Sequence, residues 1–138
     1  MFESLTRHID RIEKCGSFGT WQVDRTSKGT LEDPIQLPFV DYGKAVLSFE
    51  KDFLRFVREH PEFGLSSYYA ILGKNGLAWE YDTMKNADVD ALDAQCVLAL
   101  ITGAFRAERF SEGALLSFFK DGCILKWLKR LKALDDAE

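Results

Sequence analysis

The residues with the clearest chemical potential lie at the end of a long apolar segment, in the stretch ITGAFRAERFSEG from Ile101 to Gly113. Arginine is well suited to binding a carboxylate or a phosphate, because its planar guanidinium donates parallel hydrogen bonds. On a helix, polar or small residues spaced four, three, four and three apart share one stripe. Here that stripe comprises Gln95, Ala99, Thr102, Arg106 and Arg109. The sequence therefore allows a half-buried polar groove in which the two arginines hold an anion.

The same charges have a purely structural interpretation. Acidic residues at 88, 90 and 93 precede the apolar segment and arginines follow it, which is the order that a helix dipole favours. Thr102 can bond to a carbonyl one turn earlier, and either Glu112 or Glu108 can pair with Arg109. Helix-end charges are common whereas pockets are few, so we favour this interpretation. The alternative is a small enzyme or an anion- or metabolite-binding protein, with the candidate residues Gln95, Thr102, Arg106, Glu108 and Arg109.

A second group of charges lies near the C-terminus. Between Lys120 and Lys132 there are five basic residues and one acidic residue, Asp121. A basic amphipathic helix can bind nucleic acid, a membrane surface or an acidic partner. Lysines also keep the outer side of a packed helix in water, and we favour that role. The residues concerned are Lys126, Lys129, Arg130 and Lys132.

Motifs for catalysis and metal binding are missing. His8 and His60 stand outside any paired metal-ligand spacing, and no serine or glycine-rich motif of a hydrolase or nucleotide-binding loop is present. Asp88 and Asp90 do not share a helix face, although an uncoiled segment 88–90 could bring them together, and we rank a metal site there well below its absence. We therefore expect no metal and no cofactor, and the sequence leaves open whether the protein is an enzyme.

Composition narrows the class of protein. The 138 residues are 46% apolar, enough for a single domain spanning 1–138 with its own core. A net charge of −4 argues against non-specific nucleic-acid binding, which needs a basic surplus. Three widely spaced cysteines indicate reduced thiols and a cytoplasmic location. The longest apolar stretch, 96–107, is shorter than the roughly 20 residues that cross a bilayer, so we expect no membrane association.

Hydrophobic spacing predicts a mainly α, compact domain of five to six helices. The expected spans are 2–15, 41–60, 67–74, 88 or 90 to 110, 111–121 and 123–133, with Ser66 and Ser111 as N-caps. The middle of the fourth, CVLALITGAF, is apolar nearly all round, so this helix should be the buried centre, with Gly103 admitting another backbone. Residues 77–82 are expected to be extended. A small hairpin is expected near residues 20–40, pairing 20–24 with 35–39.

Three blocks of the chain carry a family resemblance. They are the run MKNADVDALDAQCVLALITGAFRAERFSEGALLSFFKDGCILKWLKRL, the earlier PIQLPFVDYGKAVLSF, and YYAILGKNGLAW. Together they resemble domain-of-unknown-function family 6508, a family of small bacterial proteins, over nearly the whole chain. The resemblance implies a bacterial cytoplasmic protein and supplies no activity, cofactor or catalytic residue.

The absence of a catalytic constellation and the many aromatic and amphipathic segments favour one function over the others. We expect a non-enzymatic protein-interaction module that associates with itself or with a protein partner. Binding of a small anion by the arginine stripe remains the alternative, and nucleic-acid binding ranks below both.

Overall fold

The computed structural model describes residues 1–138. It contains eight α-helices and one two-stranded antiparallel sheet, and the predicted mainly α class is confirmed. In chain order the elements are α1 (Glu3–Thr6), α2 (Ile9–Lys14), β1 (Gly19–Gln22), β2 (Phe39–Tyr42), α3 (Lys44–Glu59), α4 (Tyr68–Lys74), α5 (Tyr81–Lys85), α6 (Ala94–Ala107), α7 (Ala114–Lys120) and α8 (Cys123–Asp136). Three single 3₁₀ turns lie at Pro61–Phe63, Leu65–Ser67 and Val89–Ala91. None of the helices is long and apolar enough to cross a bilayer.

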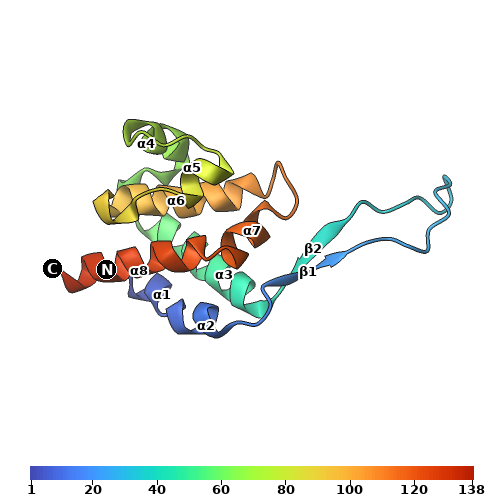
Figure 1. The fold of residues 1–138 in the computed structure, drawn as a ribbon, viewed down its shortest axis with the longest axis horizontal. Coiled ribbons are helices and arrows are strands. Elements are labelled where there is room, and N and C mark those ends of the chain that lie inside the picture. The colour runs from blue at the N-terminus through green and yellow to red at the C-terminus, as the bar shows by residue number, and fades with distance from the viewer.

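Helix α6 forms the centre of the body, as its apolar sequence predicts. It runs between α4 and α5 on one side and α8 on the other (Figure 1). Every side chain from Cys96 to Ile101 is fully buried. The helix begins at Ala94 because the carboxylate of Asp93 accepts a hydrogen bond from the amide of Cys96 at 2.9 Å. Burial along α6 thus makes it the element on which the other helices pack.

Large aromatic side chains fill the space between α3 and α6. The ring of Phe105 stacks on Phe49 and Phe53, at centroid distances of 6.0 and 5.5 Å. Helix α8 closes the opposite side of the core through Trp127 and Leu128, both fully buried. These contacts produce one continuous core of 29 buried residues.

The N-terminal segment is two short helices instead of the one predicted over 2–15. The chain breaks between α1 and α2 at Arg7 and His8, and both of these side chains reach the carboxylate of Asp52 on α3. Consecutive residues of an uninterrupted helix point about 100° apart, which works against such a shared contact. The break therefore allows neighbouring residues to bind one acid.

Other boundaries also differ from the prediction. Asp88 and Asp90 lie in a separate 3₁₀ turn and its flank, so α6 does not begin there. The segment expected to be extended, residues 77–82, ends inside α5, which begins at Tyr81. Ser66 does not cap α4, because the preceding turn already includes it and no side-chain cap bond forms.

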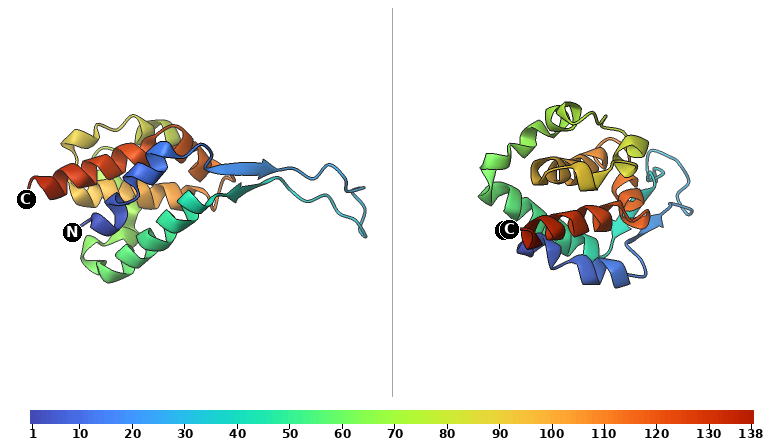
Figure 2. Two further views of the ribbon diagram at one scale, coloured as in Figure 1. Left: turned by 90° about the horizontal axis from the view of Figure 1, so that it is seen from below. Right: turned by 60° about the vertical axis from the view of Figure 1, so that its left-hand side comes forward.

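A hairpin projects from the helical body as an arm, here defined as residues 19–42. Its strands pair in register from Gly19 opposite Tyr42 to Gln22 opposite Phe39. Figure 1 and the left view of Figure 2 show the arm pointing away from the helices. The predicted hairpin is confirmed, but the paired residues lie closer to the body than expected, and Tyr42 belongs to a strand instead of to α3.

Candidate functional site

The five candidate residues of the stripe do not form one site. Thr102, Arg106 and Arg109 line a groove between α3 and α6. The side-chain amide of Gln95 is exposed and donates to the carbonyl of Phe63 at 2.8 Å. The Glu108 carboxylate accepts hydrogen bonds from amides at the start of α7. Helix α6 ends at Ala107, before Glu108 and Arg109, and the five residues lie in three different environments.

The α3–α6 groove is an apolar hollow of about 400 Å³ with charged residues at its rim. Its apolar walls are Phe53, Leu54, Val57, Leu65 and Phe105. Arg106 is half-buried and Arg109 is exposed, and neither guanidinium forms an ion pair. One acid, Glu50, also lines the groove. Two unpaired arginines beside apolar walls suit a ligand that combines an anionic group with an apolar one.

Thr102 contributes structure to this groove. It is 8% exposed, and its hydroxyl donates to the carbonyl of Leu98 at 2.9 Å, as predicted. Gly103, next to it, admits side chains where we expected a backbone. A Cβ on Gly103 would lie 3.2 Å from Cδ1 of Trp79, whose indole N–H donates to the Gly103 carbonyl at 3.0 Å. The missing side chain therefore makes room for an indole ring.

Glu108 joins the base of the arm to α7, and no ion pair forms between Glu108 and Arg109. Its carboxylate accepts from the amides of Gly113 and Leu115, at 3.1 and 3.0 Å. The phenol oxygen of Tyr42 accepts from the amide of Leu116 at 3.0 Å. These bonds satisfy amides of the first turn of α7, so the predicted cap by Ser111 is wrong.

The surroundings of Glu108 and Tyr42 raise the pKa values of both side chains. Burial, with the neighbouring Glu112 carboxylate, raises the pKa of Glu108. Burial and a hydrogen bond to Glu108 raise the pKa of the Tyr42 phenol. Both shifts favour the protonated forms of groups that hold the arm against α7.

The arm carries apolar side chains that no part of the body covers. Leu31 is fully exposed, and Leu37 and Ile35 are 81% and 62% exposed. The arm nevertheless has a defined internal structure. The carboxylate of Asp24 accepts from the amides of Ser27 and Gln36, at 3.0 and 2.8 Å, which joins its two legs. The bond from Gln36 contributes most to lowering the pKa of Asp24.

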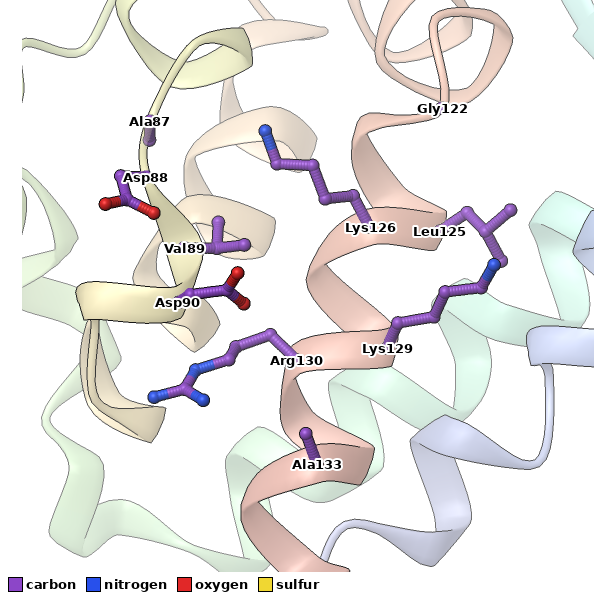
Figure 3. A pocket seen from close by; sticks show the side chains of 10 residues that line it. All are labelled: Ala87, Asp88, Val89, Asp90, Gly122, Leu125, Lys126, Lys129, Arg130 and Ala133. Atoms are coloured by element: carbon purple, nitrogen blue, oxygen red, sulfur yellow. The ribbon is translucent and has the colours of Figure 1, made fainter.

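The largest hollow lies between the turn after α5 and helix α8 (Figure 3), with a volume of about 650 Å³. It places Asp88 and Asp90 opposite Lys126 and Arg130. The Arg130 guanidinium donates to the Leu92 carbonyl at 3.0 Å. Charges of both signs face each other here, so the hollow selects neither a cation nor an anion.

The basic face of α8 is largely engaged with the protein itself. Lys126 donates to the carbonyl of Lys85 at 3.2 Å. Lys129 pairs with Glu13 at 3.1 Å, and Lys132 with Asp136 at 3.7 Å. These contacts reduce the free positive charge that nucleic acid would require.

Sequence reasoning missed a basic hollow between the α1–α2 break and α3. Its volume is about 520 Å³ and it has no apolar lining residue. It is lined by Arg7, His8, Arg11, Ser48, Lys51, Asp52 and Arg55. The polar residues of α3 in this set recur at helical spacing, which is a signal that the sequence did contain. The other lining residues lie on α2 and in the break before it, more than 30 positions away, and carry no such signal.

Ligands for a metal are not gathered anywhere in the fold. No group of three His, Cys, Asp or Glu side chains is placed to hold an ion. Cys15 is half-buried, and Cys96 and Cys123 are buried; all three are free thiols. Burial raises the pKa of Cys96 to about 11, which keeps this thiol protonated and unreactive.

Comparison with known proteins identifies the family. A sequence family described as "Family of unknown function (DUF6508)" matches residues 2–137. The chain belongs to DUF6508. The match covers the arm as well as the helical body, so the arm is part of the DUF6508 domain. No curated protein and no solved structure matches the chain.

Proposed function

We propose that this DUF6508 protein is a non-enzymatic interaction module of the bacterial cytoplasm that associates with a second copy of itself through its arm. The observation that carries the proposal is the exposure of Leu31, Ile35 and Leu37 on a structured projection. Exposed apolar clusters on soluble proteins mark interaction surfaces. The free thiols support the reducing compartment.

A structured arm binds at a lower entropic cost than a flexible one. Asp24 bonds to both legs, so the chain between them is already ordered before a partner arrives. Burial of apolar surface then contributes about 25 cal/mol per Å² to association. Because less of this energy is used in ordering the arm, more of it stabilises the complex.

The α3–α6 groove is the surface that we assign to the tip of a second copy's arm. The tip combines the fully exposed Leu31 with the neighbouring acid Glu32, which makes no hydrogen bond or ion pair. The groove combines apolar walls with the unpaired Arg106 and Arg109. Reciprocal exchange, in which each arm occupies the other copy's groove, closes as a two-fold dimer.

Light scattering coupled to size-exclusion chromatography tests this proposal. We expect the wild type to be a dimer and Leu31→Ser/Leu37→Ser to be a monomer. Leu54→Ser should have the same effect, because Leu54 is an exposed wall of the groove. Leu47→Ser is the matched control: Leu47 is equally exposed on the same helix, but outside the groove.

Charge reversal tests the arm-to-groove contact separately. Arg106→Glu should weaken the dimer, and Glu32→Arg in the same chain should restore it. A wild type that stays monomeric at every soluble concentration refutes self-association. If Glu32→Arg does not restore the dimer in the Arg106→Glu chain, the arm-to-groove contact is refuted, but self-association is not.

The groove also supports a second function, binding of a small apolar carboxylate. The half-buried Arg106 without an acidic partner favours it. A thermal-shift screen against aliphatic and aromatic carboxylates tests it, since a ligand that binds only the native state raises the melting temperature. Arg106→Ala should abolish the shift without lowering the melting temperature of the unliganded protein. The shift should persist in the monomeric arm variant, where no second copy competes for the groove.

A further inference from the structure

The basic hollow between the α1–α2 break, α2 and α3 gathers charge of one sign. Four cations line it, Arg7, Arg11, Lys51 and Arg55, against a single acid, Asp52. The chain as a whole has a net charge of −4, so the positive charge of the hollow is opposite in sign to the charge of the whole chain. Like charges held this close repel one another unless something neutralises them.

The single acid is already neutralised from within the protein. Oδ2 of Asp52 lies 2.5 Å from Nη2 of Arg7 and 2.6 Å from Nε2 of His8. The Asp52 and His8 side chains are 9% and 8% exposed. Burial opposes ionisation of this carboxyl, but the hydrogen bonds from Arg7 and His8 outweigh it and lower the pKa of Asp52. The carboxylate therefore has little remaining charge for the other cations.

Those other cations have no acidic partner. Arg11, Lys51 and Arg55 form no ion pair, and Arg11 reaches only the Ser48 hydroxyl, at 3.3 Å. By contrast, the lysines of α8 are paired or bound to carbonyls. Three free cations from two elements thus point into one concave space.

The packing beneath the hollow holds its floor in place. The His8 ring lies edge-on to Phe49 at 5.5 Å, and Phe49 belongs to the core. Asp52 comes three residues later on the same helix, one turn along the same face. The buried His8–Asp52 pair is therefore fixed in position, and it orients Arg7 through the Asp52 carboxylate. The exposed cations remain available to bind a ligand.

From this geometry we infer that the basic hollow binds a compact polyanion carrying phosphoryl groups, of the size of orthophosphate or pyrophosphate. Guanidinium groups match the oxygens of a phosphoryl group, and the ammonium of Lys51 adds a point charge. The absence of any apolar lining residue disfavours a ligand with a hydrophobic ring or chain. The roles are therefore divided: Arg11, Lys51 and Arg55 bind the anion, while His8 and Asp52 position Arg7.

Isothermal titration of the full chain with pyrophosphate at low ionic strength tests this inference, because screening by salt weakens such contacts. We expect saturable binding, and weaker saturable binding of orthophosphate. Lys51→Ala/Arg55→Ala should lower the pyrophosphate affinity at least tenfold. Lys44→Ala/Arg58→Ala is the matched control: it removes two exposed cations from the same helix, outside the hollow. That variant should change the affinity less than twofold.

A spectroscopic readout locates the ligand. The chain has two histidines, and His60 lies outside the basic hollow. The imidazole nitrogen signals of His8 should shift during a pyrophosphate titration, while those of His60 stay unchanged. Circular dichroism of both double variants should match the wild type, because the substituted side chains are exposed.

Three outcomes overturn the inference. They are the absence of saturable pyrophosphate and orthophosphate binding, an equal loss of affinity in the two double variants, and binding of single-stranded DNA or anionic vesicles without binding of pyrophosphate.

Discussion

Replacement of Gly113 by alanine tests how the arm is attached to the body. Gly113 has φ of +89°, a conformation that costs an L-residue about 1–2 kcal/mol. A Cβ at this position would also lie 2.3 Å from Cζ2 of Trp21 on β1. Ordinary contact begins near 3.4 Å, so the indole must move by about 1 Å or leave its place on α7.

The magnitude follows from what Trp21 buries. Its side chain is 44% exposed, so slightly over half of its surface is covered, or about 100 Å² for a side chain of this size. Complete loss of that contact costs up to about 2.5 kcal/mol. With the backbone strain added, we expect Gly113→Ala to lower the free energy of unfolding by ~2–4 kcal/mol.

Gly122→Ala provides the matched control. Gly122 has a similar φ of +78°, and nothing lies within 4 Å of a Cβ placed there. It should therefore cost only the ~1–2 kcal/mol of backbone strain. Urea denaturation followed by circular dichroism measures both values. In a Trp21→Ala background, Gly113→Ala should cost no more than Gly122→Ala. If the two glycine variants are equally stable in the wild-type background, Trp21 does not pack on Gly113 and the reasoning fails.

Three further substitutions test individual contacts. Because the pKa of Asp52 is lowered, the stabilisation from its ionised carboxylate is complete above the ordinary value of 3.8 and is lost as the pH falls through the lowered folded pKa. Asp52→Asn should therefore lower the free energy of unfolding by ~1.5–3 kcal/mol at pH 7 and flatten the acid limb of a stability–pH curve. An unchanged acid limb contradicts this. The pKa of Glu108 is raised above 4.5, so the stabilisation linked to its protonated form is complete below pH 4.5 and is lost as the pH rises through the folded pKa. In urea titrations, the free energy of unfolding of Glu108→Gln should therefore rise relative to that of the wild type between about pH 4 and pH 7. A difference between the two proteins that does not change with pH would contradict the raised pKa. Trp79→Phe removes the indole bond to the Gly103 carbonyl and should lower stability by ~1–2 kcal/mol, whereas an unchanged urea midpoint would mean that this bond contributes nothing.

The helical body was predictable because its pattern is local. The unbroken apolar character of α6 indicated a central helix, and the apolar spacing around Trp127 and Leu128 indicated the buried face of α8. In both cases the burial of a residue follows from neighbours within two turns of it. Boundaries were less predictable, because a break such as that at His8 depends on Asp52, a residue 44 positions away.

The sites depend on pairings that no local pattern encodes. Glu108 looks like a partner for Arg109 in the sequence, yet its carboxylate accepts hydrogen bonds from amides at the start of α7 because the chain turns back there. The first strand ends at Gln22 instead of residue 24 and the second begins at Phe39 instead of residue 35, because Asp24 organises the outer part of the arm instead of belonging to a strand. Only the polar spacing on α3 could have pointed to the basic hollow before the fold was known.

The phenol of Tyr42 has a consequence for how the arm behaves under load. Its oxygen is the acceptor for an amide in the first turn of α7, although Tyr42 itself ends the returning strand of the arm. A pull on the tip is therefore transmitted along the strand to the start of a buried helix, and the arm cannot swing to a new direction while that amide stays bonded. The exchange rate of the Leu116 amide hydrogen would then report from inside the body whether the distant tip is held or free.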